Sequence, residues 1–312
     1  MTKKEKGTMM TLAAGLAWGI SGISGQYLMS HGVHVNLLTS LRLLITGIFL
    51  LSLARSKQKE HLVAAWKQPK FLKQVLLFSI FGLVLNQYAF LRAIHLTNAG
   101  TATVLQYMAP ILILSIVCIL NRQRPTSFEI IAIAMAILGT YMIATHGKLG
   151  SLAITPKGLM WGLGSAITYS IYILLPVKLI HEWGSTIVIG SGMFIGGILF
   201  SLVTKAWQYP LQINVMSILA YIGIIGIGTI FAYTFFLKGV SIVGAVKGSL
   251  LASVEPVSSV FLTVLVLGEI FYPIDLLGML FIFLAVTLIS YKDLIALKKM
   301  KRVKYYLLGL KP

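Results

Sequence analysis

The residues best able to do chemistry in this sequence are the few ionisable groups that interrupt long apolar runs. Glu255 stands directly before Pro256 in the run VKGSLLASVEPVSSVFLTVLVLG, although the chain has only eight acidic residues. A proline removes a backbone donor and clashes one turn back, which here frees the carbonyl group of Ala252. An ionisable group beside an interrupted helix is the arrangement found at binding sites of transporter helices. We therefore expect Glu255 to bind a proton or a cationic substrate group; the alternative is an ionised Glu255 locked to a basic partner.

Two basic residues also lie inside apolar runs, where charged groups are costly and usually face the protein interior. Arg42 could bind an anionic group or pair with Glu255, or its long side chain could extend to the outer surface. Lys247 lies two turns before Glu255, within reach of the inner headgroups. Arg42, Lys247 and Glu255 are the candidates for proton or charge coupling, with structural roles as the alternative.

Uncharged polar and aromatic residues recur within the same runs. Because hydrogen-bonding groups cannot face lipid without cost, most of them should point inward. Hydrogen bonding between helices is the alternative role for each one. The candidate substrate-binding residues are Trp18, Asn86, Gln87, Tyr88, Gln106, Tyr107, Tyr169, Tyr172, Tyr233, Ser249 and Ser253. Pro110 and Pro256 are predicted to kink their helices.

The elements that position these residues follow from composition. Of 312 residues, 57% are hydrophobic and 11% charged, whereas soluble domains carry about 25% charged residues. Apolar runs of about 20 residues recur along the chain, each long enough to cross a bilayer as a helix. They leave no room for a soluble catalytic domain. The sequence predicts an all-α membrane protein with ten spans, at 8–28, 35–54, 71–92, 98–120, 127–146, 157–179, 185–204, 214–237, 242–266 and 274–291.

The net charge of +18 is distributed unevenly between the predicted loops. With the N-terminus inside, twenty Lys and Arg residues fall on the inner side and four on the outer side. This bias predicts that both termini are cytoplasmic and that the location is the cell membrane. The basic tail 292–312 should rest against anionic lipid headgroups. No nucleic-acid-binding motif accompanies the charge, so no nucleic-acid partner is expected.

An internal repeat organises the ten spans. A shift of 146 residues places LRAIHLTNAGTATVLQYMAP over LKGVSIVGAVKGSLLASVEP, so that Pro110 meets Pro256 and Glu129 meets Asp275. Each half then has five spans, and an odd number makes the second half enter the membrane from the opposite side. Inverted repeats are typical of secondary transporters. We predict repeats at 1–148 and 149–291, followed by the tail.

The sequence resembles the drug/metabolite transporter superfamily, EamA type, over nearly its whole length. The resemblance rests on AAGLAWGISGISGQYL, on LTSLRLLITG, and on the final stretch with Glu255-Pro256, Gly268-Glu269 and Gly278. The first half departs from the pattern, with Ala109-Pro110 and NRQRP at the matching places. The resemblance implies a cavity lined by helices one, three, four, six, eight and nine, and substrates such as amino acids, sugars, nucleotide derivatives, purines or drugs.

The function expected is secondary active transport of a small organic metabolite, such as an amino acid or drug-like solute, by alternating access. Export and proton coupling are implied by the family resemblance alone. The alternative is a membrane-embedded enzyme or flippase that acts on a lipid-linked substrate. The sequence has no HExxH motif, paired aspartates or Ser/His/Asp set, so no catalytic residues are assigned. No cofactor and no metal are expected, and the sequence does not predict the oligomeric state.

Overall fold

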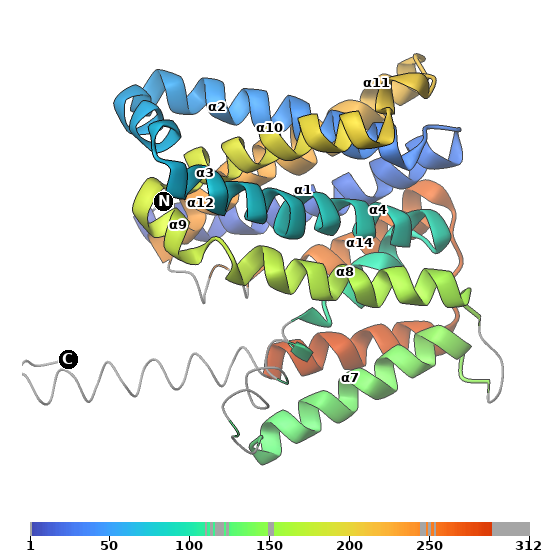
Figure 1. Ribbon diagram of the computed structural model, residues 1–312. Helices are drawn as coiled ribbons and strands as arrows, with labels where there is room; N and C mark the ends of the chain where they lie inside the picture. The colour runs from blue at the N-terminus through green and yellow to red at the C-terminus, as the bar shows by residue number, and fades with distance from the viewer. Residues whose placement is uncertain are drawn as a thin grey trace, which may run out of the picture.

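The protein is a bundle of long helices, seen in a computed structural model (Figure 1). The structure describes residues 2–109, 111–112, 115, 122, 125–148, 153–243, 248, 251–252 and 254–288, and it contains no strand within them. The first half supplies α1 (Lys3–Ser30), α2 (Val35–Lys67), α3 (Pro69–Leu77), η1 (Phe78–Val84), α4 (Leu85–Leu96), α5 (Ala99–Gln106) and α7 (Ser127–Thr145). The second half supplies α8 (Pro156–Leu174), α9 (Val177–Trp183), α10 (Ser185–Thr204), η2 (Ala206–Gln208), α11 (Val215–Tyr221), η3 (Ile222–Phe231), α12 (Ala232–Val243), α14 (Val254–Leu267) and the Pro273–Leu288 helix.

Five helices among the described residues are long and apolar enough to cross a membrane. They are Val35–Lys67, Pro69–Leu96, Ser127–Thr145, Ser185–Thr204 and Val215–Val240. Each contains most or all of one predicted span. Val254–Leu267 and Pro273–Leu288 are shorter apolar helices. The prediction of an all-helical, multi-pass membrane protein is confirmed, while the count of ten spans stays a prediction.

Two of the long helices contain π-helical segments at matching places in the two halves. In the first half, η1 joins α3 to α4, and in the second half η3 joins α11 to α12. Shifted by the 146 residues of the repeat, η1 falls within η3. A π-helical turn carries one extra residue and is frequent at functional sites. The two halves therefore share a local distortion as well as their order of helices.

The predicted proline interruptions differ between the two halves. In the first half, α5 ends at Gln106, and Tyr107 and Met108 form a turn before helix resumes at Ala109. Pro110 itself lies outside the described residues. In the second half, Pro256 lies within α14, and Leu251 and Ala252 before it are also helical. Ser253, between them, lies outside the described residues, and the kink at Pro256 stays a prediction.

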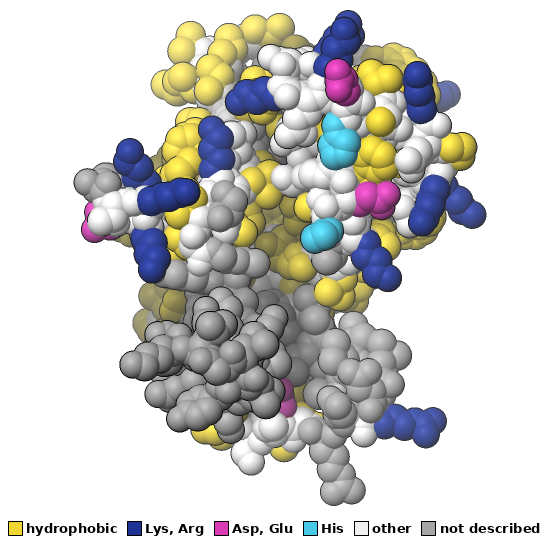
Figure 2. Space-filling model, turned by 90° about the vertical axis from the view of Figure 1, so that its left-hand side faces the viewer, with side chains coloured by type: hydrophobic (Ala, Val, Ile, Leu, Met, Phe, Trp, Pro, Cys, Tyr) yellow, Lys and Arg dark blue, Asp and Glu magenta, His cyan; other side chains and the backbone are white. Residues whose placement is uncertain are grey.

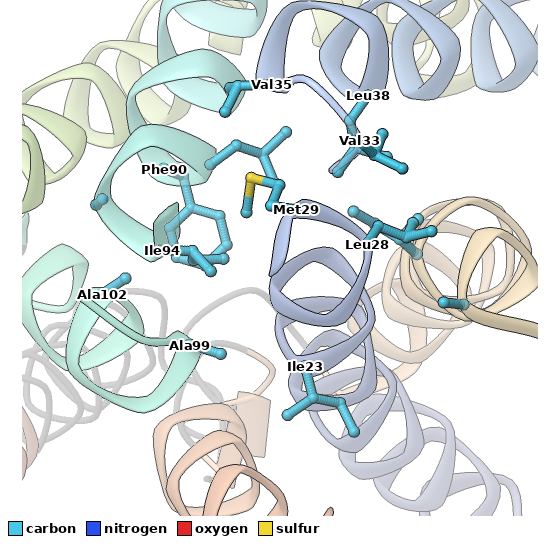
Figure 3. Packing of buried hydrophobic residues seen from close by; sticks show 14 of the residues in the cluster. Ile23, Leu28, Met29, Val33, Val35, Leu38, Phe90, Ile94, Ala99 and Ala102 are labelled. Carbon is cyan, nitrogen blue, oxygen red and sulfur yellow. The ribbon is translucent and has the colours of Figure 1, made fainter. Parts of the chain in front are cut away.

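A core of buried apolar side chains joins the predicted outer ends of α1, α2, α4 and α5 to η3. Figure 3 shows Met29 and Leu28 of α1 between Phe90 and Ile94 of α4 on one side and Leu38 of α2 on the other. Leu28 and Leu38 are fully buried. Burial of such a side chain contributes roughly 1.5–3 kcal/mol, so this end of the bundle is firmly packed.

Glycines permit close crossings between helices of the two halves. A Cβ atom at Gly47 of α2 would lie 2.5 Å from the backbone N of Phe194 in α10. A Cβ at Gly139 of α7 would lie 2.5 Å from the carbonyl O of Gly278, in the Pro273–Leu288 helix. Figure 1 shows α7 and this red helix side by side at the edge of the bundle. Small residues at such crossings let membrane helices approach closely.

Candidate functional site

Glu255 is buried at the start of α14 and is bound by a tyrosine of the first half. Tyr107, at the turn that follows α5, donates its hydroxyl to Glu255 Oε2 at 3.1 Å. The same hydroxyl lies 3.3 Å from the carbonyl O of Ala252, the oxygen that Pro256 leaves without its usual backbone donor. Tyr107 thus connects the interrupted helices of the two halves.

No described residue forms an ion pair with Glu255, but Arg42 is close enough to interact with it electrostatically, so a basic partner stays an alternative. The ion pair found between two described residues joins His146 to Asp275. Glu255 is 8% exposed, and Tyr107 is the described side chain that donates to its carboxyl group. Lys247, the nearest basic residue in sequence, lies outside the described residues. The carboxyl group therefore keeps acceptor capacity for a ligand or a proton.

Arg42 lies inside the bundle, and the expectation that its side chain might extend to the outer surface is wrong. Its Nε donates to Thr229 Oγ1 at 2.9 Å, and Arg42 is 7% exposed. Thr229 belongs to η3, and its hydroxyl donates in turn to the carbonyl O of Ile224 at 2.7 Å. The π-helical segment thus supplies the hydroxyl group that holds the guanidinium.

A cluster of amide side chains lies between α4, α5 and α8. Gln106 Nε2 donates to Asn86 Oδ1 at 3.2 Å, and the Thr168 hydroxyl lies 3.5 Å from the same oxygen. Gln87, the next residue on α4, is 4% exposed, and neither its amide nitrogen nor its amide oxygen has a partner. A buried unpaired amide is rare in native structures. Gln87 is therefore a described residue with buried hydrogen-bonding groups that a ligand could use.

Aromatic rings from three helices form a continuous series. Trp18 of α1 meets Tyr233 of α12 edge to face, with ring centroids 5.9 Å apart. Tyr233 meets Tyr172 of α8 at 6.5 Å, and Tyr172 stacks on Tyr169 at 5.7 Å. Sequence reasoning missed Phe236, which lies 5.1 Å from Trp18. Such a series can bind an apolar or aromatic group of a solute through ring faces and edges.

The remaining candidates do not join these contacts. Tyr88 packs against Trp161 and Phe200, on another side of α4 from the amide cluster. Ser249 and Ser253, like Lys247 and Pro110, lie outside the described residues. Thr229 and Thr168 were missed because single threonines in apolar runs usually bond to their own helix.

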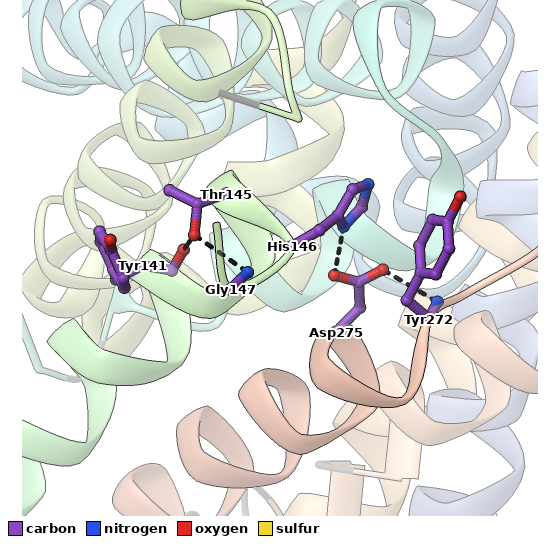
Figure 4. A network of polar contacts seen from close by, with 6 residues as sticks. All are labelled: Tyr141, Thr145, His146, Gly147, Tyr272 and Asp275. Carbon is purple, nitrogen blue, oxygen red and sulfur yellow. Dashed lines mark hydrogen bonds and ion pairs between the residues drawn. The ribbon is translucent and has the colours of Figure 1, made fainter. Parts of the chain in front are cut away.

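The predicted outer ends of the helices are joined by polar contacts. Gln26 of α1 donates to Glu269 Oε1 at 2.7 Å and accepts from the backbone N of Ala99 at 2.7 Å. Figure 4 shows His146, after α7, directed at Asp275 Oδ1. Burial lowers the pKa of His34, and the charges of Arg92 and His95 lower it further. Gln26 with Glu269, and His146 with Asp275, thus join the two halves at the predicted outer end.

Asp275 and Glu129, paired by the repeat, share one structural role. Each accepts a backbone N–H at the start of its helix: Glu129 from Thr126 at 2.6 Å and Asp275 from Tyr272 at 3.0 Å. A carboxylate at this position satisfies a free helix donor and favours the helix dipole. The repeat thus preserves a helix cap, and Asp275 adds the contact with His146.

The described residues hold no group of three or more His, Cys, Asp or Glu side chains placed to bind a metal. What they hold is an acid and a base, each anchored by a neutral hydroxyl, together with an unpaired amide and a series of aromatic rings. This combination suits non-covalent binding of a small solute that has both polar and apolar parts.

Comparison with known proteins gives the family. The EamA-like transporter family matches residues 5–145 and again residues 156–291. An uncharacterized inner membrane transporter of Salmonella typhimurium, YicL, is 35% identical over 93% of this chain and 97% of its own. An uncharacterized transporter of Bacillus subtilis, YetK, is 27% identical over 89% of this chain and 85% of its own. A solved crystal structure shares the fold, with a TM-score of 0.59 and 19% identity over 91% of this chain and 96% of that one. The chain belongs to the EamA-like transporter family of membrane transport proteins.

Proposed function

We propose that this protein is a secondary active transporter that exports a small organic metabolite, such as an amino acid or a drug-like solute, by alternating access with proton coupling. The observation that supports this most is that Arg42 and Glu255 are both buried and are held by Thr229 and Tyr107. If Arg42 and Glu255 were paired with each other, they would have few hydrogen-bonding groups left for a ligand. Opposite charges anchored by neutral hydroxyls can each still bind a charged group of a solute.

Within this proposal Glu255 binds the proton or a cationic group, and Arg42 orients an anionic one. The binding set is Trp18, Asn86, Gln87, Gln106, Tyr107, Tyr169, Tyr172 and Tyr233, with Tyr88, Ser249 and Ser253 as further candidates. Lys247 is a candidate for charge coupling. Pro110 and Pro256 interrupt the helices that meet at this site. Protonation of Glu255 would weaken its hold on a cationic group and favour release.

The proposed architecture is ten spans in two inverted five-helix repeats, at residues 1–148 and 149–291, in the cell membrane. Both termini lie in the cytoplasm, where the basic residues 292–312 contact anionic headgroups. Two matches to one family, one in each half, support the repeat. The excess of Lys and Arg on the loops of one side supports the orientation.

The test is thermal unfolding of the purified protein with a panel of amino acids, nucleosides, sugars and cationic drugs. A ligand present at 100 times its dissociation constant adds about 2.7 kcal/mol to the free energy of unfolding. Glu255→Gln removes the acid and keeps the shape of its side chain. Glu60→Gln is the matched control because it makes the same change at an exposed residue of α2 that is outside the proposed binding set. We expect a stabilising ligand whose effect is lost in Glu255→Gln and kept in Glu60→Gln.

Proteoliposomes then test transport itself. The ligand identified above, radiolabelled, should accumulate when a proton gradient is imposed, and collapse of the gradient with an ionophore should abolish this accumulation. Exchange without accumulation would contradict proton coupling and leave the binding site intact. Stabilisation by lipid-linked compounds alone would replace the proposal with the flippase alternative.

A further inference from the structure

A cavity separate from the site of Arg42 and Glu255 opens on the predicted cytoplasmic side, where most of the Lys and Arg residues lie. It has a volume of about 130 Å³ and lies between α2, α10 and α12. Leu50 and Leu53 of α2 and Leu237 of α12 form apolar walls, and Lys57 and Lys238 lie at its edge. Figure 2 shows Lys and Arg side chains spread over this face, with hydrophobic side chains exposed between them.

The shape of the cavity follows from a change of direction in α2. Gln58 has non-helical dihedral angles, φ −145° and ψ 42°, so α2 bends there and Gln58 lines the cavity. Deeper in the bundle α2 is held close to α10, since a Cβ at Gly190 would lie 3.0 Å from Leu50 Cβ. Helices α2 and α10 are thus packed closely near Leu50 and lie further apart near Gln58, where the cavity opens.

The charged residues that line the cavity are both basic. Lys57 and Lys238 come from different helices, and the cavity has no acidic residue among those that line it. Thr186, in the first turn of α10, also lines it and offers a hydroxyl donor. Apolar walls below two ammonium groups complement a molecule with an anionic head and a hydrocarbon chain.

We propose that this cavity binds one anionic phospholipid of the cytoplasmic leaflet. Its phosphate contacts Lys57, Lys238 and Thr186, and the upper part of one acyl chain lies against Leu50, Leu53 and Leu237. The chain continues along α2, where Ile48 and Phe49 are exposed. A free phosphate would use the lysines but leave the apolar walls in contact with water, so the lipid is the occupant that fits both. Basic pockets between helices on this side of a membrane are known to hold anionic headgroups.

Native mass spectrometry of the full chain tests this. Delipidated protein is titrated with phosphatidylglycerol, with phosphatidylcholine of the same acyl chains, and with inorganic phosphate. We expect phosphatidylglycerol to bind most tightly, and Lys57→Gln and Lys238→Gln each to weaken it about fivefold. Lys59→Gln is the control, because Lys59 is exposed on the same segment and does not line the cavity.

Three outcomes would overturn the proposal. Equal weakening by Lys59→Gln would show a diffuse basic surface, and equal binding of phosphatidylcholine would show no selectivity for the anion. Inorganic phosphate that competes fully with the lipid would assign the site to a soluble anion. Leu53→Gln is a second test that can be used if the lysine variants do not fold. It keeps both charges, so it should weaken the binding of phosphatidylglycerol and leave any phosphate binding unchanged. Because the site is distinct from Glu255, these results do not depend on the proposed transport.

Discussion

Among the described residues, the unpaired buried amide of Gln87 indicates the binding site more clearly than the charges of Arg42 and Glu255 do. Gln87 and Asn86 are neighbours on α4 and are similarly buried, but only Asn86 has hydrogen-bond partners. A buried polar group left unpaired costs about 1–3 kcal/mol of stability. A group that lowers stability and is nonetheless present is expected to serve binding.

Gln87→Leu should therefore raise the free energy of unfolding by about 1–3 kcal/mol and reduce solute transport. Asn86→Leu is the matched comparison, and it should lower the free energy of unfolding because it leaves Gln106 without its acceptor. Unfolding followed by intrinsic fluorescence and uptake into proteoliposomes measure the two effects. If Gln87→Leu instead destabilised the protein and left transport unchanged, Gln87 would be structural.

Removal of the Tyr107 hydroxyl gives a second prediction at this scale. Tyr107→Phe keeps the ring and its packing but takes away the donor to Glu255 and to Ala252. We expect a loss of about 1–3 kcal/mol in stability, since a buried carboxyl group loses its described partner. Transport should also change its pH profile, because the described hydrogen bond to the Glu255 carboxyl group is gone. An unchanged profile would separate Tyr107 from proton coupling.

The helices depend on close approach at a few glycines. Gly47→Ala would place a methyl group against the backbone of α10, which cannot move aside as a flexible side chain can. Overpacking of this kind costs about 1–3 kcal/mol. Gly164→Ala in α8 is the control, because a Cβ there meets no atom within 4 Å. That change should be neutral or stabilising by about 0.5–1 kcal/mol, since alanine favours the helix. Chemical denaturation of both variants decides the matter, and equal effects would contradict the crossing.

For the whole molecule, the contacts at the outer end hold the two halves together. Glu269→Ala removes the acceptor of Gln26 and should increase the fraction of molecules open to the outside. A cysteine at Thr101, which lines an outer cavity of about 260 Å³, reports this opening through a membrane-impermeant thiol reagent, in a Cys118→Ser background. We expect faster labelling in Glu269→Ala. The same rate in both proteins would show that this contact does not close the outer end.

The sequence predicted the helices better than the site. Apolar length is a local property, so the bounds of α7 and α10 and the start of α2 followed directly, whereas α2 continues beyond the predicted residue 54 to Lys67 and α5 ends at Gln106, inside the predicted span 98–120. The bond between Tyr107 and Glu255 joins residues 148 apart in the sequence, and no local pattern specifies it. The position of Arg42 was ambiguous for the same reason, because its partner Thr229 lies on η3 and π-helical turns have no simple sequence signal.

The matching π-helical segments also set the direction of the residues that follow them. An insertion of one residue into an α-helix turns everything beyond it by about 100°, and the extra residue in a π-helical turn absorbs this change. Asn86 and Gln87 follow η1 directly and are buried in the register that the extra residue sets. Loss of one residue from η1 would therefore turn both amides away from their present surroundings.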